Sequence, residues 1–198
     1  MDIAILTFDG FNELDSFIAL GILNRMKEKG WTVQITSPTK SVTSMNGVTI
    51  ESQQALEFAR RADVVLFGSG IKTRDLAQDR ELLSNLQLDP TRQFIGGQCS
   101  GTLLMSVLGL LQDVPACTDL TTKPWVVESG VKVLEQPFYA QGNIATAGGC
   151  LSSQYLAAWV IGKLGGREAV ESAIHYVAPV GEKEQTVTHC MSVVSEYL

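Results

Sequence analysis

The sequence predicts a three-layer α/β/α sandwich built around a mostly parallel sheet. Short apolar segments of strand type alternate along the chain with segments of helical periodicity. The segment Asp63–Phe67 is an almost continuous apolar run, as expected for a strand that is buried on both faces. The segment Phe94–Met105 passes from apolar residues through glycines and a cysteine into a helical pattern, which is typical of a nucleophile elbow.

In the first half of the chain, each expected element ends at a residue that breaks regular structure. The first strand covers Ile3–Phe8, and an amphipathic helix from about Asp15 to Lys29 ends at Gly30. The elements that follow are strands at Val33–Ser37, at Val48–Ile50 after the Gly47 turn and at Asp63–Phe67 before Gly68-Ser69-Gly70, then a helix over about Arg74–Leu88 that Asp89-Pro90 breaks.

The second half repeats this alternation. Phe94–Ile95 is the strand that leads to Cys99, and the next helix runs to about Leu108. Because parallel strands need crossover connections, the pattern predicts a sheet with helices on both faces. No linker interrupts it, so residues 1–198 are expected to form one domain. The remaining expected elements are strands at Val131–Val133 and Asn143–Ala147 and helices at Leu151–Leu164 and Arg167–His175.

Composition narrows the functional class. The chain has 198 residues, of which 45% are apolar and 18% charged, and this suits a single well-buried core. Its net charge is -6 and its sequence has no run rich in lysine and arginine, so binding to nucleic acid or to an anionic membrane is disfavoured. No apolar stretch approaches the roughly 20 residues that span a bilayer, and no secretion signal is recognised. We therefore expect a cytoplasmic protein whose partner is a small molecule.

The four cysteines are expected to be free thiols. Cys99, Cys117, Cys150 and Cys190 are widely spaced and form no Cys-x-x-Cys pair, which argues against a disulfide framework and a zinc ribbon. No histidine cluster supports a metal site either, and none is expected. Cys117 and Cys190 are interpreted as small buried apolar residues. Cys150 follows two glycines at a helix start, where packing is the simpler interpretation and proximity to the site the alternative.

Three loops are expected to meet at one edge of the sheet, since ligands bind beyond the carboxyl ends of parallel strands. They are residues 9–15, the Gly68-Ser69-Gly70 loop and the elbow at residues 96–101. The glycines let the chain turn sharply at Cys99, over the first N–H groups of a helix. Positive partial charge there favours a thiolate, so this thiol is expected to be unusually acidic and nucleophilic.

Two carboxylates and one glycine complete the expected site. Glu13 and Asp15 lie at the start of the first helix, where acidic residues are common for structural reasons. Alternatively, one of them lies beside Cys99 as a proton donor or acceptor, with a pKa raised by burial. The backbone N–H of Gly70 is a candidate oxyanion donor, although the glycine could serve the turn alone.

Histidine chemistry has little support in this sequence. The chain has two histidines, His175 and His189, and neither lies in an obvious triad setting. Surface or ordinary polar contacts are their simpler interpretation, and a histidine that acts on Cys99 would have to come from the C-terminal segment or another subunit. The segment Thr121–Trp125 follows an expected strand containing Cys117 and is a candidate wall of the pocket.

The chain resembles the ThiJ/PfpI superfamily, also described as class I glutamine amidotransferase-like, over nearly its whole length. The matching segments are Ile3–Gly10, the acidic loop Phe11–Asp15, Asp63–Gly68, the elbow Gly96–Gly101 and Ala145–Gly149. The resemblance implies a flavodoxin-like sandwich, a reactive cysteine at Cys99 and a carboxylic acid partner, for which Asp15 matches better than Glu13. It also implies a homodimer.

Within this superfamily, the isocyanide hydratase-like branch is the most similar in its motifs. Leu14-Asp15 and Cys99-Ser100 fit its pattern, whereas Ser16-Phe17 departs from the Leu-x-Gly-Pro that usually follows the acid. The implied reaction is thiolate attack on an isocyanide, protonation by Asp15 and hydrolysis to an N-formamide. Backbone donors near Gly70 and Ser100 would stabilise charge, and no cofactor would be needed.

Other members of the superfamily define the alternatives. Peptidases usually carry histidine after the cysteine, where this chain has Ser100, and true amidotransferases carry a late His-x-Glu, where this chain has His189-Cys190-Met191. A non-catalytic redox sensor, in which Cys99 is oxidised reversibly, is one alternative. An enzyme of glyoxalase or deglycase type is another.

Overall fold

The computed structural model describes all residues, 1–198, and its strands form one large sheet and one small one. The large sheet has seven strands and the small sheet is the two-stranded pair of β3 and β4. The strands are β1 (Asp2–Leu6), β2 (Thr32–Ser37), β3 (Ser41–Thr43), β4 (Thr49–Glu51), β5 (Gln54–Ala55), β6 (Val64–Phe67), β7 (Phe94–Gln98), β8 (Phe138–Gln141) and β9 (Ile144–Ala147).

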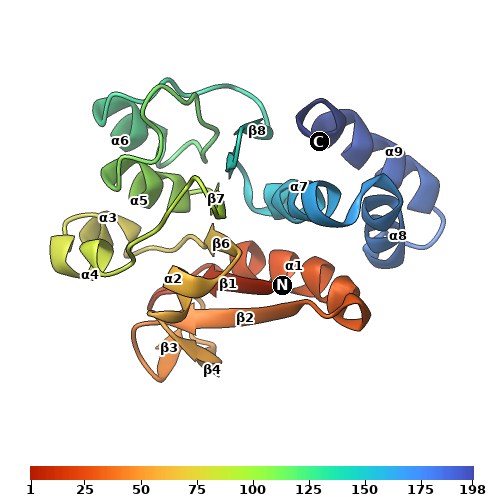
Figure 1. Ribbon diagram of the computed structural model, residues 1–198. Helices are drawn as coiled ribbons and strands as arrows, with labels where there is room; N and C mark the ends of the chain where they lie inside the picture. Colours follow the sequence, from red (N-terminus) through yellow and green to blue (C-terminus); the bar gives the residue numbers. More distant parts are fainter.

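Helices cover both faces of the large sheet (Figure 1). The α-helices are α1 (Glu13–Leu23), α2 (Phe58–Arg61), α3 (Thr73–Leu76), α4 (Arg80–Ser84), α5 (Gly101–Val107), α6 (Lys123–Glu128), α7 (Ser153–Gly165), α8 (Arg167–Val177) and α9 (Lys183–Val194). Short 3-10 segments are η1 (Asn24–Lys29), η2 (Cys150–Ser152) and η3 (Ser195–Tyr197). This arrangement confirms the predicted α/β/α sandwich.

The strand order is β5-β2-β1-β6-β7-β9-β8, and every neighbouring pair is parallel except β8 with β9. The register aligns the ends of the central strands, because Leu6 lies opposite Phe67 and Gln98 lies opposite Ala147. The loops that follow β1, β6, β7 and β9 therefore leave the sheet at one edge. This alignment brings the three loops expected from the sequence together with a fourth.

The core has two parts, one on each face of the sheet. Alternate residues of β1 point to opposite faces, so Ile3 and Ile5 pack with α1 and α7 while Ala4 and Leu6 pack with α2 and α5. Trp159 of α7 is fully buried, with its ring 5.5 Å from that of Phe94. These two apolar layers hold the carboxyl edge of the sheet in a fixed geometry.

Several expected elements are corrected by the structure. The helix expected over residues 74–88 is two short helices, because Asp79 caps a new start by accepting from the Leu82 N–H. Residues 131–133 form only an isolated bridge between Ala116 and Val133, which also replaces the expected strand around Cys117. The first helix changes to 3-10 geometry at Asn24, and the helix at Arg167 is not the last. The elements missed altogether include α6, β8 and α9.

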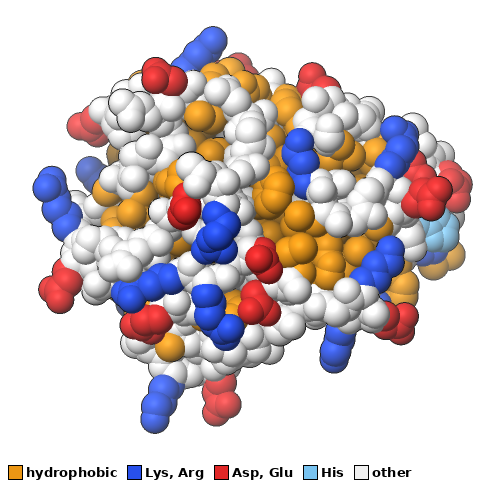
Figure 2. All heavy atoms as spheres, viewed as in Figure 1, with side chains coloured by type: hydrophobic (Ala, Val, Ile, Leu, Met, Phe, Trp, Pro, Cys, Tyr) orange, Lys and Arg blue, Asp and Glu red, His pale blue; other side chains and the backbone are white.

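The surface in Figure 2 carries Lys and Arg interspersed with Asp and Glu, and apolar side chains gather near the centre of that view. None of the helices is both long and apolar enough to cross a bilayer.

Candidate active site

Cys99 occupies the turn between β7 and α5. Its φ is +48°, a left-handed conformation that a non-glycine residue adopts only under constraint from its surroundings. Two hydrogen bonds supply part of that constraint. The Cys99 N–H donates to Ala147 O at 2.8 Å, and the Cys99 carbonyl accepts from Thr118 Oγ1 at 2.8 Å. The strand, strained residue and helix form the elbow expected from the sequence.

A close backbone approach explains the glycine after the elbow. A Cβ on Gly101 would lie 2.5 Å from Phe67 O and 2.7 Å from Gly68 O, so only glycine lets α5 begin against the end of β6. Gly97 is less restricted, since the atom 2.5 Å from a Cβ there is Met105 Sδ, in a flexible side chain, and the nearest backbone atom is Thr102 N at 3.1 Å. These glycines therefore help to place Cys99 by permitting close contact, whereas the expected turn at a glycine is wrong because the left-handed residue is Cys99 itself.

Asp15 lies in the first turn of α1 and its carboxyl group reaches the Cys99 thiol. Asn12 caps this helix by accepting from the Leu14 N–H at 3.1 Å. The carboxyl is 2% exposed, and its Oδ2 accepts a hydrogen bond from Ser69 Oγ while its Oδ1 has no partner. The structure thus brings together the carboxyl and the thiol that the sequence proposed, and adds Ser69 from the glycine loop as the group that orients the carboxyl.

Burial has the largest influence on the pKa values of Asp15 and Cys99. It raises the pKa of the Asp15 carboxyl, against the hydrogen bond from Ser69 that lowers it. Burial also raises the pKa of the Cys99 thiol above its ordinary range, and the Asp15 carboxylate raises it further. The expected unusually acidic thiol is therefore wrong for this structure, because desolvation and a neighbouring carboxylate oppose the thiolate. Gln98 Nε2, 3.3 Å from Cys99 Sγ, acts in the other direction.

Gly70 and Ser100 contact each other beside the elbow. The Gly70 N–H donates to Ser100 Oγ at 3.2 Å, so the expected oxyanion donor is already engaged. Thr73 Oγ1 lies 2.9 Å from the same hydroxyl. The backbone N–H of Ser100 has no hydrogen-bond partner, which leaves it as the freer candidate for charge stabilisation. A Cβ on Gly70 would lie 2.5 Å from Gly10 O, so close approach to the first loop is a structural reason for this glycine.

Cys150 lies in the cluster, although packing was the simpler interpretation from the sequence. The reactive atoms of Asp15, Cys99 and Cys150 all lie within 4.8 Å of one another. Asn12 Nδ2 lies 3.2 Å from Cys150 Sγ and donates to it, and Gln98 Nε2 donates to Gly149 O at 2.8 Å. The sequence signal for Cys150 was its place at a helix start after Gly148-Gly149.

Two thiols and one carboxylate are also ligand types for a thiophilic metal ion. The three residues form a group close enough to share one ion. The sequence expectation of no metal site considered only spacing along the chain. It could not identify a group made of residues 15, 99 and 150, which lie far apart in the sequence, in α1, in the elbow after β7 and at the start of η2.

The cluster opens into a cavity of about 410 Å³. Its walls come from the first loop, from the loop before α3 and from α6, with Arg74 stacked 4.7 Å above the ring of Trp125. Of the candidate wall Thr121–Trp125, the residues Thr121, Thr122 and Trp125 line this cavity. The lining residues are Asn12, Met45, Ser69, Gly70, Ile71, Arg74, Cys99, Ser100, Asp119, Thr121, Thr122, Trp125 and Cys150.

Glu13 has a structural role away from the thiols. Its carboxylate accepts from Ser44 Oγ and from Asn46 Nδ2, so it ties α1 to the β3–β4 hairpin. These hydrogen bonds, that from Ser44 first, lower the pKa of Glu13. Glu13 and Asp15 are two residues apart, yet their carboxyl groups have opposite pKa shifts because only Asp15 is buried.

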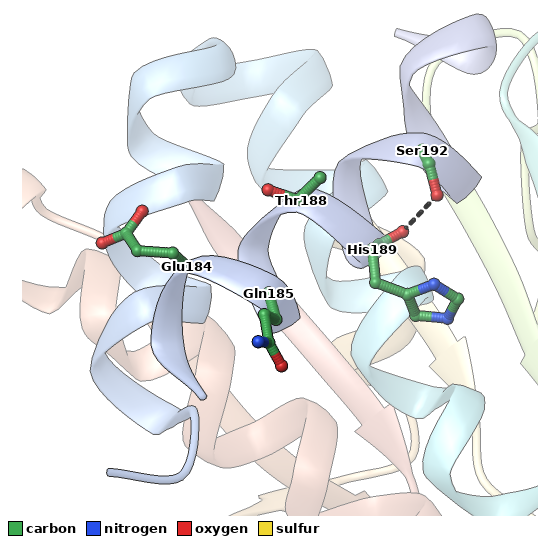
Figure 3. A pocket seen from close by; sticks show the side chains of 5 residues that line it. All are labelled: Glu184, Gln185, Thr188, His189 and Ser192. Atoms are coloured by element: carbon green, nitrogen blue, oxygen red, sulfur yellow. Dashed lines mark hydrogen bonds between the residues drawn. The ribbon is translucent and has the colours of Figure 1, made fainter. Parts of the chain in front are cut away.

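Neither histidine lines the cavity that contains Cys99. Figure 3 shows His189 on α9 beside a shallow hollow lined only by residues of that helix. Its ring packs against that of Tyr155 at 6.3 Å, and His175 Nε2 lies 3.5 Å from Glu184 Oε1. Both contacts are surface or packing contacts, and the titratable partners of Cys99 in this chain are Asp15 and Cys150.

Replacing Asp15 with asparagine is expected to stabilise the protein at neutral pH. A carboxyl whose pKa is raised on folding favours the fold below its unfolded pKa of 3.8, and this contribution is lost as pH rises through the folded pKa. Asparagine is uncharged throughout, so the free energy of unfolding at pH 7 should rise by about 1–3 kcal/mol, the usual penalty of an unpaired buried polar group.

Urea unfolding at pH 7 and at pH 4 checks this, and the gain should shrink at the lower pH. Glu13→Gln is the matched control, and its effect on stability at pH 7 should have the opposite sign. Because the pKa of Glu13 is lowered on folding, its carboxylate stabilises the fold above the unfolded pKa, and this contribution is lost as the pH falls through the folded pKa. An Asp15→Asn protein that is less stable than the original by the same amount at both pH values contradicts the assignment.

Comparison with known proteins agrees with the fold described above. The chain matches the DJ-1/PfpI family over residues 1–162, whereas no curated protein matches it. Three similar solved structures are Schizosaccharomyces pombe DJ-1, a ThiJ/PfpI family protein from Pseudomonas syringae and Drosophila melanogaster DJ-1beta.

These structures share the fold at low sequence identity. S. pombe DJ-1 has a TM-score of 0.76 and 15% identity, covering 90% of this chain and 100% of its own. The P. syringae protein has a TM-score of 0.75 and 21% identity, and the match covers 99% of this chain and 86% of that protein. Drosophila DJ-1beta has a TM-score of 0.76 and 18% identity, and the match covers 89% of this chain and 96% of that protein. By its match over residues 1–162 and by this fold, the chain belongs to the DJ-1/PfpI family.

Proposed function

We propose that the protein is a cofactor-independent enzyme that adds water to a small electrophile at Cys99, with an isocyanide as the substrate and an N-formamide as the product. One observation carries this proposal. A buried carboxyl group with one unpaired oxygen lies within 4.8 Å of a thiol at the base of a cavity of about 410 Å³. Such a pair can exchange a proton while the sulfur attacks carbon.

The raised pKa values define how the first step would proceed. A free thiolate beside Asp15 is disfavoured, so the proton of Cys99 would move to the Asp15 carboxylate as sulfur bonds to the isocyanide carbon. Asp15 would then give this proton to the same carbon, which yields a thioimidate. Ser69 Oγ, donating to Asp15 Oδ2, would hold the carboxyl in place during both transfers.

The second step releases the product. Water adds to the thioimidate carbon, and the carbon–sulfur bond breaks to give the formamide and the Cys99 thiol. The unpartnered Ser100 N–H is a donor for charge that develops during this addition. The Gly70 N–H could contribute only by exchanging its hydrogen bond with Ser100 Oγ.

The direct test is to incubate the protein with a panel of alkyl isocyanides and follow formamide production by NMR. Formamide above the rate of a sample without protein supports the proposal. Absence of product from every isocyanide contradicts the isocyanide assignment. A parallel panel of α-oxoaldehydes addresses the glyoxalase or deglycase alternative.

A redox sensor is the second candidate, because the buried Asp15 carboxyl, whose Oδ1 is unpaired, lies close enough to Cys99 to hydrogen-bond an oxygen added to its sulfur. Its expected signature is stable addition of two oxygens at Cys99 after mild peroxide, without turnover of any electrophile. The family resemblance further supports a homodimer, and the cytoplasm is the location that we propose from the sequence. Light scattering of the purified protein tests the dimer.

A further inference from the structure

We infer that Cys99 and Cys150 are a reacting pair, and that oxidation of Cys99 by a hydroperoxide ends in a disulfide between them. The inference shares with the proposed function only the premise that Cys99 is reactive. It requires no turnover of an electrophile. It assigns to Cys150 a covalent role that neither hydration nor oxidation of Cys99 alone would need.

The topology of the sheet places the two cysteines side by side. Cys99 follows β7 and Cys150 follows β9, two parallel strands whose last paired residues are Gln98 and Ala147. Both sulfurs belong to the group of atoms that lie within 4.8 Å of one another. A disulfide requires the two sulfurs to approach to about 2.05 Å, which calls for a local shift of one side chain.

The loop that bears Cys150 can supply that shift. Cys150 begins the three-residue segment η2, is half-buried and follows Gly149 at φ +88°. Its sulfur accepts one hydrogen bond, from Asn12 Nδ2 at 3.2 Å. Gln98 Nε2 donates both to Cys99 Sγ and to Gly149 O, so one amide holds this loop beside the elbow.

The chemistry balances with a hydroperoxide as the only oxidant. Cys99 sulfur attacks the peroxide, the O–O bond breaks, and the products are a Cys99 sulfenic acid and an alcohol, or water from hydrogen peroxide. Asp15 is placed to accept the thiol proton and to give it to the departing oxygen. The Cys150 sulfur then attacks the Cys99 sulfur and water leaves, which forms the disulfide. An external thiol reverses this by two successive exchanges.

The electrostatics of the cluster favour the oxidised product. Two thiols and a carboxyl share one mostly buried site, and burial raises the pKa of each of them. A disulfide is neutral and removes both acidic sulfurs from the neighbourhood of Asp15. Thiols with raised pKa values are also poor leaving groups, so exchange of this disulfide with an external thiol should be slow.

Peptide mapping after peroxide treatment tests the inference. The native protein is treated with hydrogen peroxide, its remaining thiols are alkylated after denaturation, and tryptic peptides are analysed by mass spectrometry. The expected result is a crosslink between Cys99 and Cys150, a loss of two hydrogens from the intact mass and two fewer alkylated thiols. Fragment spectra are needed because Cys99 and Cys117 share a tryptic peptide.

Cys150→Ser gives the second measurement. Without the resolving thiol, Cys99 should accumulate two oxygens, and the fraction of Cys99 that dithiothreitol restores to a thiol should fall by about tenfold. Cys190→Ala is the matched control, since this buried thiol lies on α9 outside the cluster, and it should behave as the unchanged protein.

The outcomes separate this inference from the proposed function. If the native protein retains an alkylatable Cys150 after peroxide treatment, whether Cys99 is oxidised or not, the inference is wrong even where isocyanides are hydrated. If the crosslink forms while no isocyanide is converted, the inference stands and the proposed hydration is wrong. The crosslink in the native protein decides the matter even if Cys150→Ser fails to fold.

Discussion

Cys99→Ala is expected to reduce isocyanide turnover to the rate measured without protein. Under the proposed function, the Cys99 sulfur forms the bond to the isocyanide carbon, so its removal eliminates the first step. Loss of an enzyme nucleophile lowers turnover by about 10⁴-fold or more. The measurement is formamide production under saturating substrate, with the folded state of the variant checked by urea unfolding.

Cys190→Ala is the matched control for this prediction. Cys190 is as buried as Cys99, but it lies on α9 and does not line the cavity. Its removal therefore has a similar effect on packing, and turnover should be preserved. Residual activity of Cys99→Ala above background would exclude Cys99 as the nucleophile. Equal losses in both variants would show that packing, and not the thiol, accounts for the effect.

Gly101→Ala is expected to destabilise the protein and to displace the elbow. The added methyl group would lie 2.5 Å and 2.7 Å from two backbone oxygens at the end of β6, and neither oxygen can move without breaking the sheet edge. Overpacking of this kind costs about 3 kcal/mol, which exceeds the gain in helix propensity of about 1 kcal/mol from replacing glycine. Turnover should also fall, because a start of α5 farther from β6 would shift the adjoining Cys99 relative to Asp15.

Gly21→Ala supplies the comparison. Gly21 lies in α1 with no atom within 4 Å of its hypothetical Cβ, so the same substitution should stabilise the protein by about 0.5–1 kcal/mol. Urea unfolding of both variants measures the difference. If Gly101→Ala is as stable as the unchanged protein, the close approach of α5 to β6 is not required for the fold.

Local sequence patterns were sufficient to identify the elbow and the loops that meet at the sheet edge. Cys99 was identified because glycines and an apolar strand precede it and a helical pattern follows it, all within one segment. The convergence of three loops followed from the rule that parallel strands end at a common edge. The Asp15 partner came from the family resemblance, and the structure places its carboxyl beside Cys99.

Other features depended on contacts between segments that are distant in sequence. β8 pairs antiparallel with β9, and the split between α3 and α4 depends on the cap formed by Asp79. Cys150 enters the site because β7 and β9 are neighbours, which the order of strands along the chain does not reveal. The interaction of Gly70 with Ser100 likewise joins two loops 30 residues apart.

The sequence by itself therefore determined the α/β/α class and placed Cys99 in an elbow at the edge of the sheet where we propose that a ligand binds. Only the tertiary structure decided the direction of the pKa shift of Cys99 and which groups lie beside it. Helix-terminus electrostatics can be inferred from local sequence, and they predicted an acidic thiol. Desolvation and the Asp15 carboxylate depend on burial by segments far apart in the chain, and they raise the pKa of Cys99 instead.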